Sequence, residues 1–136
     1  MELFQNKKPK FVTRFVGRKS EIDKKANCLD FSAFYRPDNM KYREVSVFKI
    51  YKKDTNEKIF EIGDKKVFKK HGTIARGDLK VEDIEKIELQ QEKLKLHWNI
   101  YSRHCNIKPF PKDPIVAQHI STQLAKISVL RERDNK

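Results

Sequence analysis

Cysteine is scarce in this chain, which has only Cys28 and Cys105 among its 136 residues. Two cysteines cannot form the disulfide framework that stabilises many small secreted domains, so we expect reduced thiols, no disulfide and a cytoplasmic protein. Met1–Lys10 has no apolar core, and we therefore expect no signal peptide. No segment approaches the roughly 18 apolar residues of a membrane-spanning helix, so we expect no membrane partner.

Glycine is also scarce, with four residues, and the motifs of well-known active sites are absent. There is no glycine-rich phosphate-binding loop, no HExxH, no pair of CxxC motifs and no GxSxG. His97, His104, Cys105 and Cys28 are of the types that bind zinc, but their spacing matches no familiar zinc-binding pattern. We therefore predict no metal ion and no cofactor.

Positive charge, in contrast, is abundant. The chain has 31 Lys and Arg against 19 Asp and Glu, a formal net charge of +12. Residues 1–80 carry 21 basic against 11 acidic residues, a net of +10, and residues 81–136 carry a net of +2. Such an excess attracts polyanions, so we expect the first 80 residues to face a nucleic acid. A lysine-rich composition with no functional meaning is the alternative, because surface lysines are common.

Apolar periodicity predicts one α+β domain over residues 11–130, between a flexible basic lead-in, 1–10, and a solvated tail, 131–136. Strict alternation predicts strands over Lys10–Gly17 and Glu44–Lys52. The order of elements favours a small, mostly antiparallel or mixed sheet, with short helices and a long C-terminal helix packed on it.

The C-terminal helix has the clearest pattern. Asp113 is its expected N-cap, and Pro114 occupies the first helical position. One apolar stripe at helical spacing comprises Val116, Ile120, Leu124, Ile127 and Leu130.

Weaker patterns predict the remaining elements. Asp54 or Thr55 should cap a short helix that runs through Ile62 and ends at Gly63. The segment Lys93–Ile100 alternates as a strand, with Leu94, Leu96, Trp98 and Ile100 toward the core. Further expected elements are a helix at Glu21–Ala26, a turn at Arg36–Asn39, a strand at Thr73–Arg76, a helical turn within Lys80–Glu85 and a strand at Ile84–Leu89.

The loop from Tyr101 to Asn106 is the strongest candidate for a chemical site. An imidazole side chain such as that of His104 can transfer a proton, while arginine binds phosphate oxygens. With Arg76 and Arg14, and with His97 or His71 as second acid or base, His104 could cleave RNA without a metal ion. The alternative is that His104 is structural and ties this loop to the following helix.

Basic residues interleave with aromatic residues in the first half of the chain. Cations follow phosphates while aromatic rings stack on unpaired bases, and Tyr35, Tyr42 and Tyr51 are candidates for stacking or for core packing. The run DKKVFKK, Asp64–Lys70, is also strongly basic. The predicted nucleic-acid-binding residues are Arg14, Arg18, Lys19, Arg36, Lys41, Arg43, Lys52, Lys53 and Arg103.

The order of four short motifs is TRFV, FSAF, SVFKI and RHCNIKPFP before a helix. This order resembles a group of small bacterial proteins of unassigned function, some of them encoded among mobile or defence genes. The resemblance covers most of the chain. It implies that Arg14, Ser46, His104 and Asn106 matter together, and that the protein is one accessory component among several.

The sequence leaves three functions open. We favour a non-enzymatic, nucleic-acid-binding accessory component of a larger bacterial assembly, with defence as the candidate process and RNA or DNA as ligand. A metal-independent endoribonuclease or nucleotide-acting toxin is the second hypothesis, with His104, Arg76 and Arg14 as catalytic residues. The third is an adaptor whose basic face binds an acidic protein.

Overall fold

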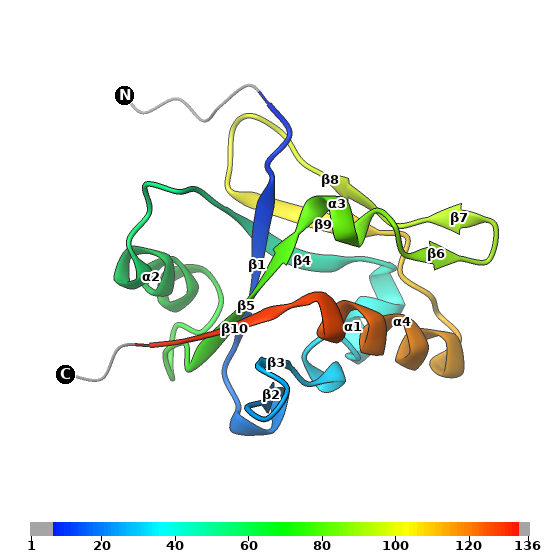
Figure 1. Ribbon diagram of the computed structural model, residues 1–136, viewed down its shortest axis with the longest axis horizontal. Helices are drawn as coiled ribbons and strands as arrows, with labels where there is room; N and C mark the ends of the chain where they lie inside the picture. Colours follow the sequence, from blue (N-terminus) through cyan, green and yellow to red (C-terminus); the bar gives the residue numbers. More distant parts are fainter. Residues whose placement is uncertain (1–6, 134–136) are drawn as a thin grey trace.

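The computed structural model describes residues 7–133 and contains a six-stranded antiparallel sheet with helices on both faces (Figure 1). The order of strands across the sheet is β10-β5-β1-β4-β9-β8. The predicted α+β fold, with a mostly antiparallel sheet and a C-terminal helix, is confirmed. The strands of this sheet are β1 (Phe11–Val16), β4 (Val45–Ile50), β5 (Ala75–Lys80), β8 (Lys95–His97), β9 (His104–Lys108) and β10 (Val129–Glu132).

The remaining elements are short, apart from two helices. The α-helices are α1 (Pro37–Tyr42), α2 (Asn56–Lys66), α3 (Val81–Ile84) and α4 (Pro114–Ile127). Two 3₁₀ turns are η1 (Lys19–Glu21) and η2 (Phe31–Ala33). Two small hairpins pair β2 (Ile22–Asp23) with β3 (Cys28–Leu29), and β6 (Glu88–Leu89) with β7 (Glu92–Lys93).

The alternation along the strands divides the apolar residues between two cores. Val12, Val47 and Ile107 belong to the larger core, beneath α4 and η2. Phe15 and Phe48 point to the other face and pack with Ile59 of α2 in a smaller core. Because a strand places successive side chains on opposite faces, both faces of the sheet are covered, although α2 covers only part of its side.

Helix α2 begins where the sequence predicts and continues past the predicted end. Thr55 is the N-cap, and its hydroxyl accepts a hydrogen bond from the Lys58 N–H at 3.1 Å. The prediction that Gly63 ends the helix is wrong, because this glycine is a packing position. A Cβ there would lie 2.4 Å from Thr73 Oγ1 and 2.8 Å from the Phe15 ring, so only glycine lets α2 approach the sheet this closely.

Helix α4 confirms its predicted N-terminus but ends at Ile127. The Asp113 carboxylate accepts from the Val116 N–H at 3.0 Å, as an N-cap should. Leu130, placed by its spacing on the helical stripe, lies in β10 instead. Ser128 has extended backbone and redirects the chain, and the Leu130 N–H donates to Asn27 O. Hydrophobic spacing predicts only that Leu130 is buried. A buried position in β10 satisfies that pattern as well as a position on the helix does, so the pattern did not distinguish the two.

Several short predictions are also corrected. His104 and Asn106 lie in β9 rather than in a loop. Strand β8 ends at His97, so Trp98 is only half-buried and Ile100 is exposed. The carboxamide oxygen of Asn99 accepts hydrogen bonds from the backbone N–H groups of Tyr101 and Ser102. This local turn ends the alternation of the strand.

Two predicted segments near the N-terminus fold differently. The helix expected at Glu21–Ala26 is replaced by η1 and β2, since the buried Glu21 is held by an ion pair with Arg36. The turn expected at Arg36–Asn39 is the start of α1, with Pro37 at its first position. The strand expected at Thr73–Arg76 begins two residues later, as β5.

Both ends of the described chain are attached to the domain. Pro9 is buried and Lys8 forms an ion pair with Glu85, while strand β10 runs past residue 130. The lead-in's Met1–Asn6 and the tail's residues 134–136 lie outside the described residues.

Cys28 and Cys105 are buried and form no disulfide, as expected. Burial raises the pKa of Cys105 to about 11, which keeps this thiol protonated at neutral pH. No helix within residues 7–133 has the length and apolar character needed to cross a membrane.

Candidate nucleic-acid interface

Strands β1 and β4, at the centre of the sheet, stop pairing at Arg14. The candidate site lies at the gap between them. β1 pairs with β4 only from Phe11 to Thr13, and from Arg14 onward it pairs with β5 alone. The Arg14 side chain occupies the gap. Its Nε donates to Ala33 O at 3.0 Å, and its Nη1 donates to Ser46 O at 2.8 Å. The guanidinium thus replaces the ladder hydrogen bonds that the separated strands lack.

The charge of Arg14 has no direct acidic partner among the described residues. Its two hydrogen bonds go to carbonyl oxygens, and Nη2 has no partner within residues 7–133. Burial and the neighbouring Arg36 lower the pKa of Arg14 to about 10, against a smaller opposing effect of Glu21. Arg14 is therefore still cationic at neutral pH. The carboxylate of Glu21 is bound by Arg36, so Arg14 retains capacity for an external anion.

Two adjoining cavities of about 150 and 300 Å³ share Arg14, Arg36 and Ser46, and we call them together the Arg14 groove. The smaller cavity is otherwise lined by the apolar residues Phe15, Phe48, Val67 and Phe68. The larger is otherwise lined by Asp38, Asn39, Tyr42 and Glu44. The groove therefore has cations at its centre, an apolar wall on the α2 side, and at its other end an aromatic ring, Tyr42, that is 62% exposed.

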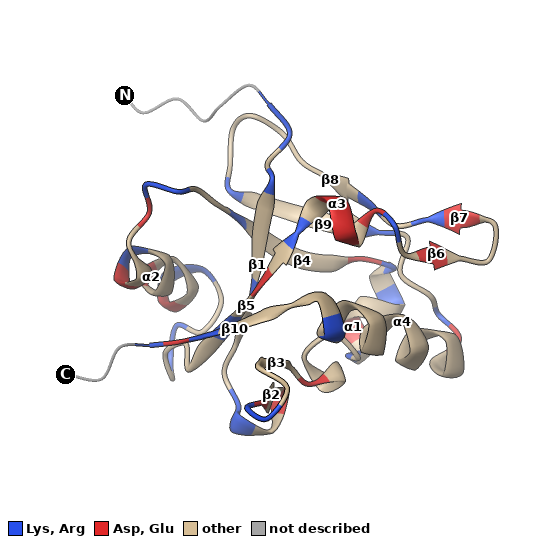
Figure 2. Ribbon diagram, viewed as in Figure 1, with Lys and Arg blue, Asp and Glu red and all other residues tan. Residues whose placement is uncertain are grey.

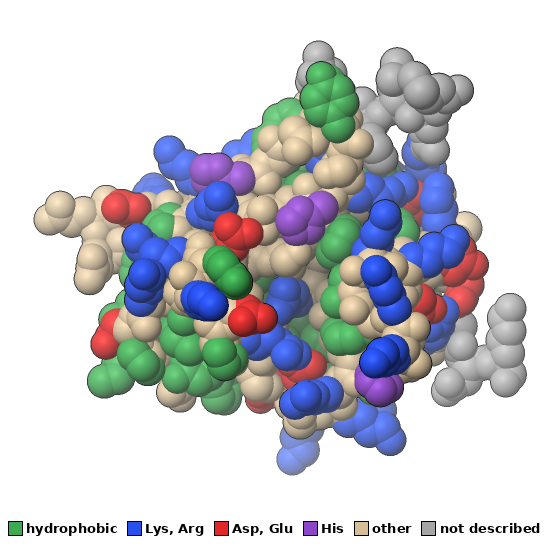
Figure 3. Space-filling model, turned by 180° about the vertical axis from the view of Figure 1, so that it is seen from behind, with side chains coloured by type: hydrophobic (Ala, Val, Ile, Leu, Met, Phe, Trp, Pro, Cys, Tyr) green, Lys and Arg blue, Asp and Glu red, His purple; other side chains and the backbone are tan. Residues whose placement is uncertain are grey.

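Lysines cluster at the α2 end of the groove. Val67 and Phe68, which line it, lie between the pairs Lys65–Lys66 and Lys69–Lys70. All four lysines are exposed, and none forms an ion pair with another described residue. Figure 2 shows both acidic and basic residues along α2 and basic residues on the loop after it, and Figure 3 shows Lys and Arg side chains on the surface of the molecule seen from behind. The sequence signal is the run DKKVFKK, which the predicted set of nucleic-acid-binding residues left out.

Four of the predicted nucleic-acid-binding residues belong to this region. Arg14 and Arg36 line the groove. Arg18 and Lys19 follow the end of β1 next to Gly17, where a Cβ would lie 2.8 Å from the Phe68 ring. This close contact places the start of that exposed basic segment beside the groove wall.

The other five do not line the groove, although two of them flank Tyr42, which does. Lys41 and Arg43 flank Tyr42, with the Lys41 ammonium 5.4 Å from the centre of its ring. Lys52 and Lys53 follow β4 at the opposite end of β1, because Ile50 pairs with Phe11. Arg103 is mostly buried in a two-bond ion pair with Asp54.

The structure brings His104 to Arg14 through Ser46. The Ser46 hydroxyl and His104 Nε2 are 2.6 Å apart, and Ser46 pairs with Asn106 across the β4–β9 ladder. The imidazole also lies edge-on to Phe48, with ring centres 5.4 Å apart. Arg14, Ser46, His104 and Asn106 therefore form one connected group at the side of the groove. Histidine side chains are visible on this face in Figure 3.

Arg76 does not belong to this group. Its Nη1 donates to Asp78 at 2.6 Å and its Nη2 donates to Asn56 at 2.8 Å, in a different cavity. His71 lies in the turn before β5 rather than in β9 or the groove. His97 is the cross-strand neighbour of Asn106 in β8.

Within the described part of the chain, no three His, Cys, Asp or Glu residues are grouped to hold a metal ion. His104 and Cys105 are successive residues of β9, so their side chains point to opposite faces of the sheet. Cys105 is part of the larger core, whereas His104 is exposed.

Comparison with protein-family models, with curated proteins and with solved structures gives no match to this chain. The function is therefore inferred from the groove and from the charges around it.

Proposed function

We propose that the protein binds single-stranded nucleic acid in the Arg14 groove, as a non-enzymatic accessory component of a larger cytoplasmic assembly. The observation that carries the proposal is Arg14: its cation is held in the sheet by two carbonyl oxygens, with no carboxylate partner among residues 7–133, and it lines a cavity. A phosphate is the natural anion for such a guanidinium. The two free thiols agree with a reducing compartment.

The surroundings of Arg14 suit a single strand. Lys65, Lys66, Lys69 and Lys70, which form no ion pair with another described residue, can contact successive phosphates beyond the groove. Tyr42 and Phe68, at opposite ends of the groove, offer rings on which unpaired bases can stack. Such contacts give affinity with little sequence preference, because they address phosphates and ring faces rather than base edges.

Replacing Arg14 by glutamine tests this proposal. We expect about tenfold weaker binding of labelled single-stranded RNA or DNA in fluorescence anisotropy at low salt, and a shallower salt dependence by about 0.7 in the log–log slope. Lys93→Gln removes the same charge from the β6–β7 hairpin, on the opposite side of the molecule from α2 in Figure 1, and should leave affinity unchanged.

Absence of low-salt affinity for either nucleic acid would refute the proposal, as would equal losses in the two variants. A protein partner retained at high salt would instead support the acidic-partner hypothesis, because phosphate contacts weaken steeply under those conditions.

The contact between His104 and Ser46 favours a second candidate function, metal-independent cleavage of bound RNA. When Nε2–H of His104 donates to the Ser46 hydroxyl oxygen, the lone pair of this exposed imidazole lies on Nδ1. It could take the proton of a ribose 2′-hydroxyl while the 2′-oxygen attacks the adjacent phosphorus. The bond to the 5′-oxygen then breaks, this oxygen takes a proton from water, and Arg14 stabilises the charge on the phosphate.

For this candidate, His104→Ala should lower the rate of RNA cleavage by about 100-fold while retaining oligonucleotide affinity and fold. The measurement is gel analysis of end-labelled RNA, with DNA of the same sequence as a substrate that lacks the 2′-hydroxyl. Intact RNA after incubation with the wild-type protein would eliminate the enzyme hypothesis and leave the binding proposal standing.

A further inference from the structure

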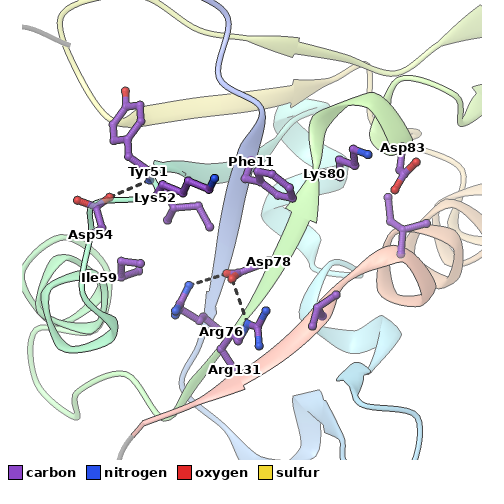
Figure 4. Close-up of a pocket in the computed structure, with 13 residues that line it drawn as sticks. Phe11, Tyr51, Lys52, Asp54, Ile59, Arg76, Asp78, Lys80, Asp83 and Arg131 are labelled. Carbon is purple, nitrogen blue, oxygen red and sulfur yellow. Dashed lines mark hydrogen bonds and ion pairs between the residues drawn. The ribbon is translucent and has the colours of Figure 1, made fainter. Parts of the chain in front are cut away.

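A separate cavity of about 550 Å³ lies at the other end of β1, between α2 and β10 (Figure 4). Its volume is that of a typical small-molecule site. Phe11 and Ile50, a cross-strand pair, contribute apolar surface from the sheet. Ile59 of α2 borders it on one side, and Val129 of β10 borders it on the other.

Apolar surface is unusually exposed in this cavity. Phe11 is 44% exposed although β1 is a central strand, and Val129 is 39% exposed. Helix α2 covers the Phe15 end of the same face, and within residues 7–133 no helix packs over the ring of Phe11. An exposed aromatic ring at the edge of a cavity is suited to stacking against a planar ring.

The polar part of the cavity is a connected ionic network. Arg76 is buried and is held by Asp78 and Asn56, while its Nε is buried without a hydrogen-bond partner among the described residues. The second oxygen of Asp78 lies 3.5 Å from Nε of Arg131. The carboxylate thus holds Arg131 at the cavity while half of that side chain remains exposed (Figure 4).

Two further cations line the cavity. Lys52 and Lys80 lie on either side of the Phe11 ring in Figure 4. Lys52 has no ion pair within residues 7–133, and Lys80 is 3.9 Å from Glu82, with both side chains largely exposed. The lining has four basic side chains, those of Lys52, Arg76, Lys80 and Arg131, against the three carboxylates of Asp54, Asp78 and Asp83, an excess of one positive charge. Asp54 is bound by Arg103, and Asp78 is shared by two arginines.

We propose that this cavity binds a free nucleoside 5′-phosphate. Its planar base stacks on Phe11, and its phosphates lie among Lys52, Lys80 and Arg131. The carboxylate of Asp83 is available to a hydroxyl or amino group of the same ligand. The combination of a ring face with several cations favours this class over an apolar ligand or a simple inorganic anion. The site is independent of the nucleic-acid groove, because the two cavities share no lining residue.

Calorimetric titration with the four nucleoside triphosphates, the corresponding nucleosides and inorganic triphosphate tests the proposal. At least one nucleoside triphosphate should bind more tightly than either its nucleoside or inorganic triphosphate. Phe11→Leu, which keeps an apolar side chain but removes the aromatic ring, should weaken that binding about tenfold. Lys52→Gln should weaken triphosphate binding and leave any nucleoside binding unchanged, and Lys93→Gln should change neither.

Thermal melting of each variant checks that the fold is retained. A panel in which no nucleotide binds would overturn the proposal, and so would wild-type affinity in both Phe11→Leu and Lys52→Gln. Titration in the presence of a saturating single-stranded oligonucleotide separates this site from the Arg14 groove. Unchanged nucleotide affinity is expected, whereas competition would place the nucleotide in the groove and overturn the separate site.

Discussion

Replacement of Asp54 by alanine should lower the free energy of unfolding by about 3–5 kcal/mol, the usual cost of leaving one member of a buried ion pair without its partner. The Asp54 side chain is fully buried, and its two oxygens accept from Arg103 at 2.7 and 3.1 Å. It also accepts from the Tyr51 N–H at 2.9 Å. The carboxylate therefore joins the end of β4, the start of α2 and the residue before His104.

The same pair has a pH dependence with a defined sign. Burial by itself raises the pKa of Asp54. Hydrogen bonds from Arg103 and the Tyr51 N–H, together with the charges of Arg103 and Lys58, lower this pKa by more than burial raises it, so the net shift is downward. A lowered folded-state pKa means that the stabilisation is present above the ordinary aspartate pKa and is lost as the pH falls through the folded-state value. The stability difference between wild type and Asp54→Ala should therefore shrink in strong acid.

Urea denaturation at neutral and acidic pH measures both effects. Lys58→Ala is the matched control, because Lys58 is an exposed partner of the same carboxylate, at 3.6 Å, and should cost at most about 1 kcal/mol. Equal losses in the two variants would show that the buried pair with Arg103 does not stabilise this corner. Arg103 is predicted to bind nucleic acid, yet its bonds to Asp54 favour a structural role.

Removal of four charges at the α2 end of the groove should have the largest effect on binding. In the variant K65Q/K66Q/K69Q/K70Q, we expect affinity for single-stranded nucleic acid to fall by up to about 1,000-fold at low salt. The log–log salt slope should become shallower by about 3, since each lost phosphate contact removes about 0.7. Anisotropy titrations over a series of salt concentrations give both quantities.

A second quadruple variant separates local contact from net charge. K86Q/K93Q/K112Q/K126Q removes the same four charges from exposed positions in the less basic part of the chain. Long-range attraction alone would weaken binding equally in both variants. We expect the second variant to lose far less affinity, and equal losses would contradict a binding site at α2.

Local sequence patterns predicted the main elements well. Alternation in β1 and β4, the Thr55 cap of α2 and the Asp113 cap of α4 depend on neighbouring residues, and all are confirmed. The wrong predictions are at positions whose structure is determined by contacts with residues far away in the sequence. Gly63 continues a helix because Phe15 and Thr73 pack against it, and Leu130 joins the sheet because β5 offers a free edge.

The candidate site was only partly predictable for the same reason. Composition and the lysine runs determined by themselves that the chain is a strongly basic polyanion-binding candidate, and the RHCNIKPFP segment drew attention to His104. The tertiary structure alone decided which residues meet. It separates β1 from β4 at Arg14, joins Ser46 to His104 across a ladder, and places Arg76 in another cavity. Charge and periodicity are local properties of a chain, whereas strand pairing and burial depend on contacts between segments far apart in sequence.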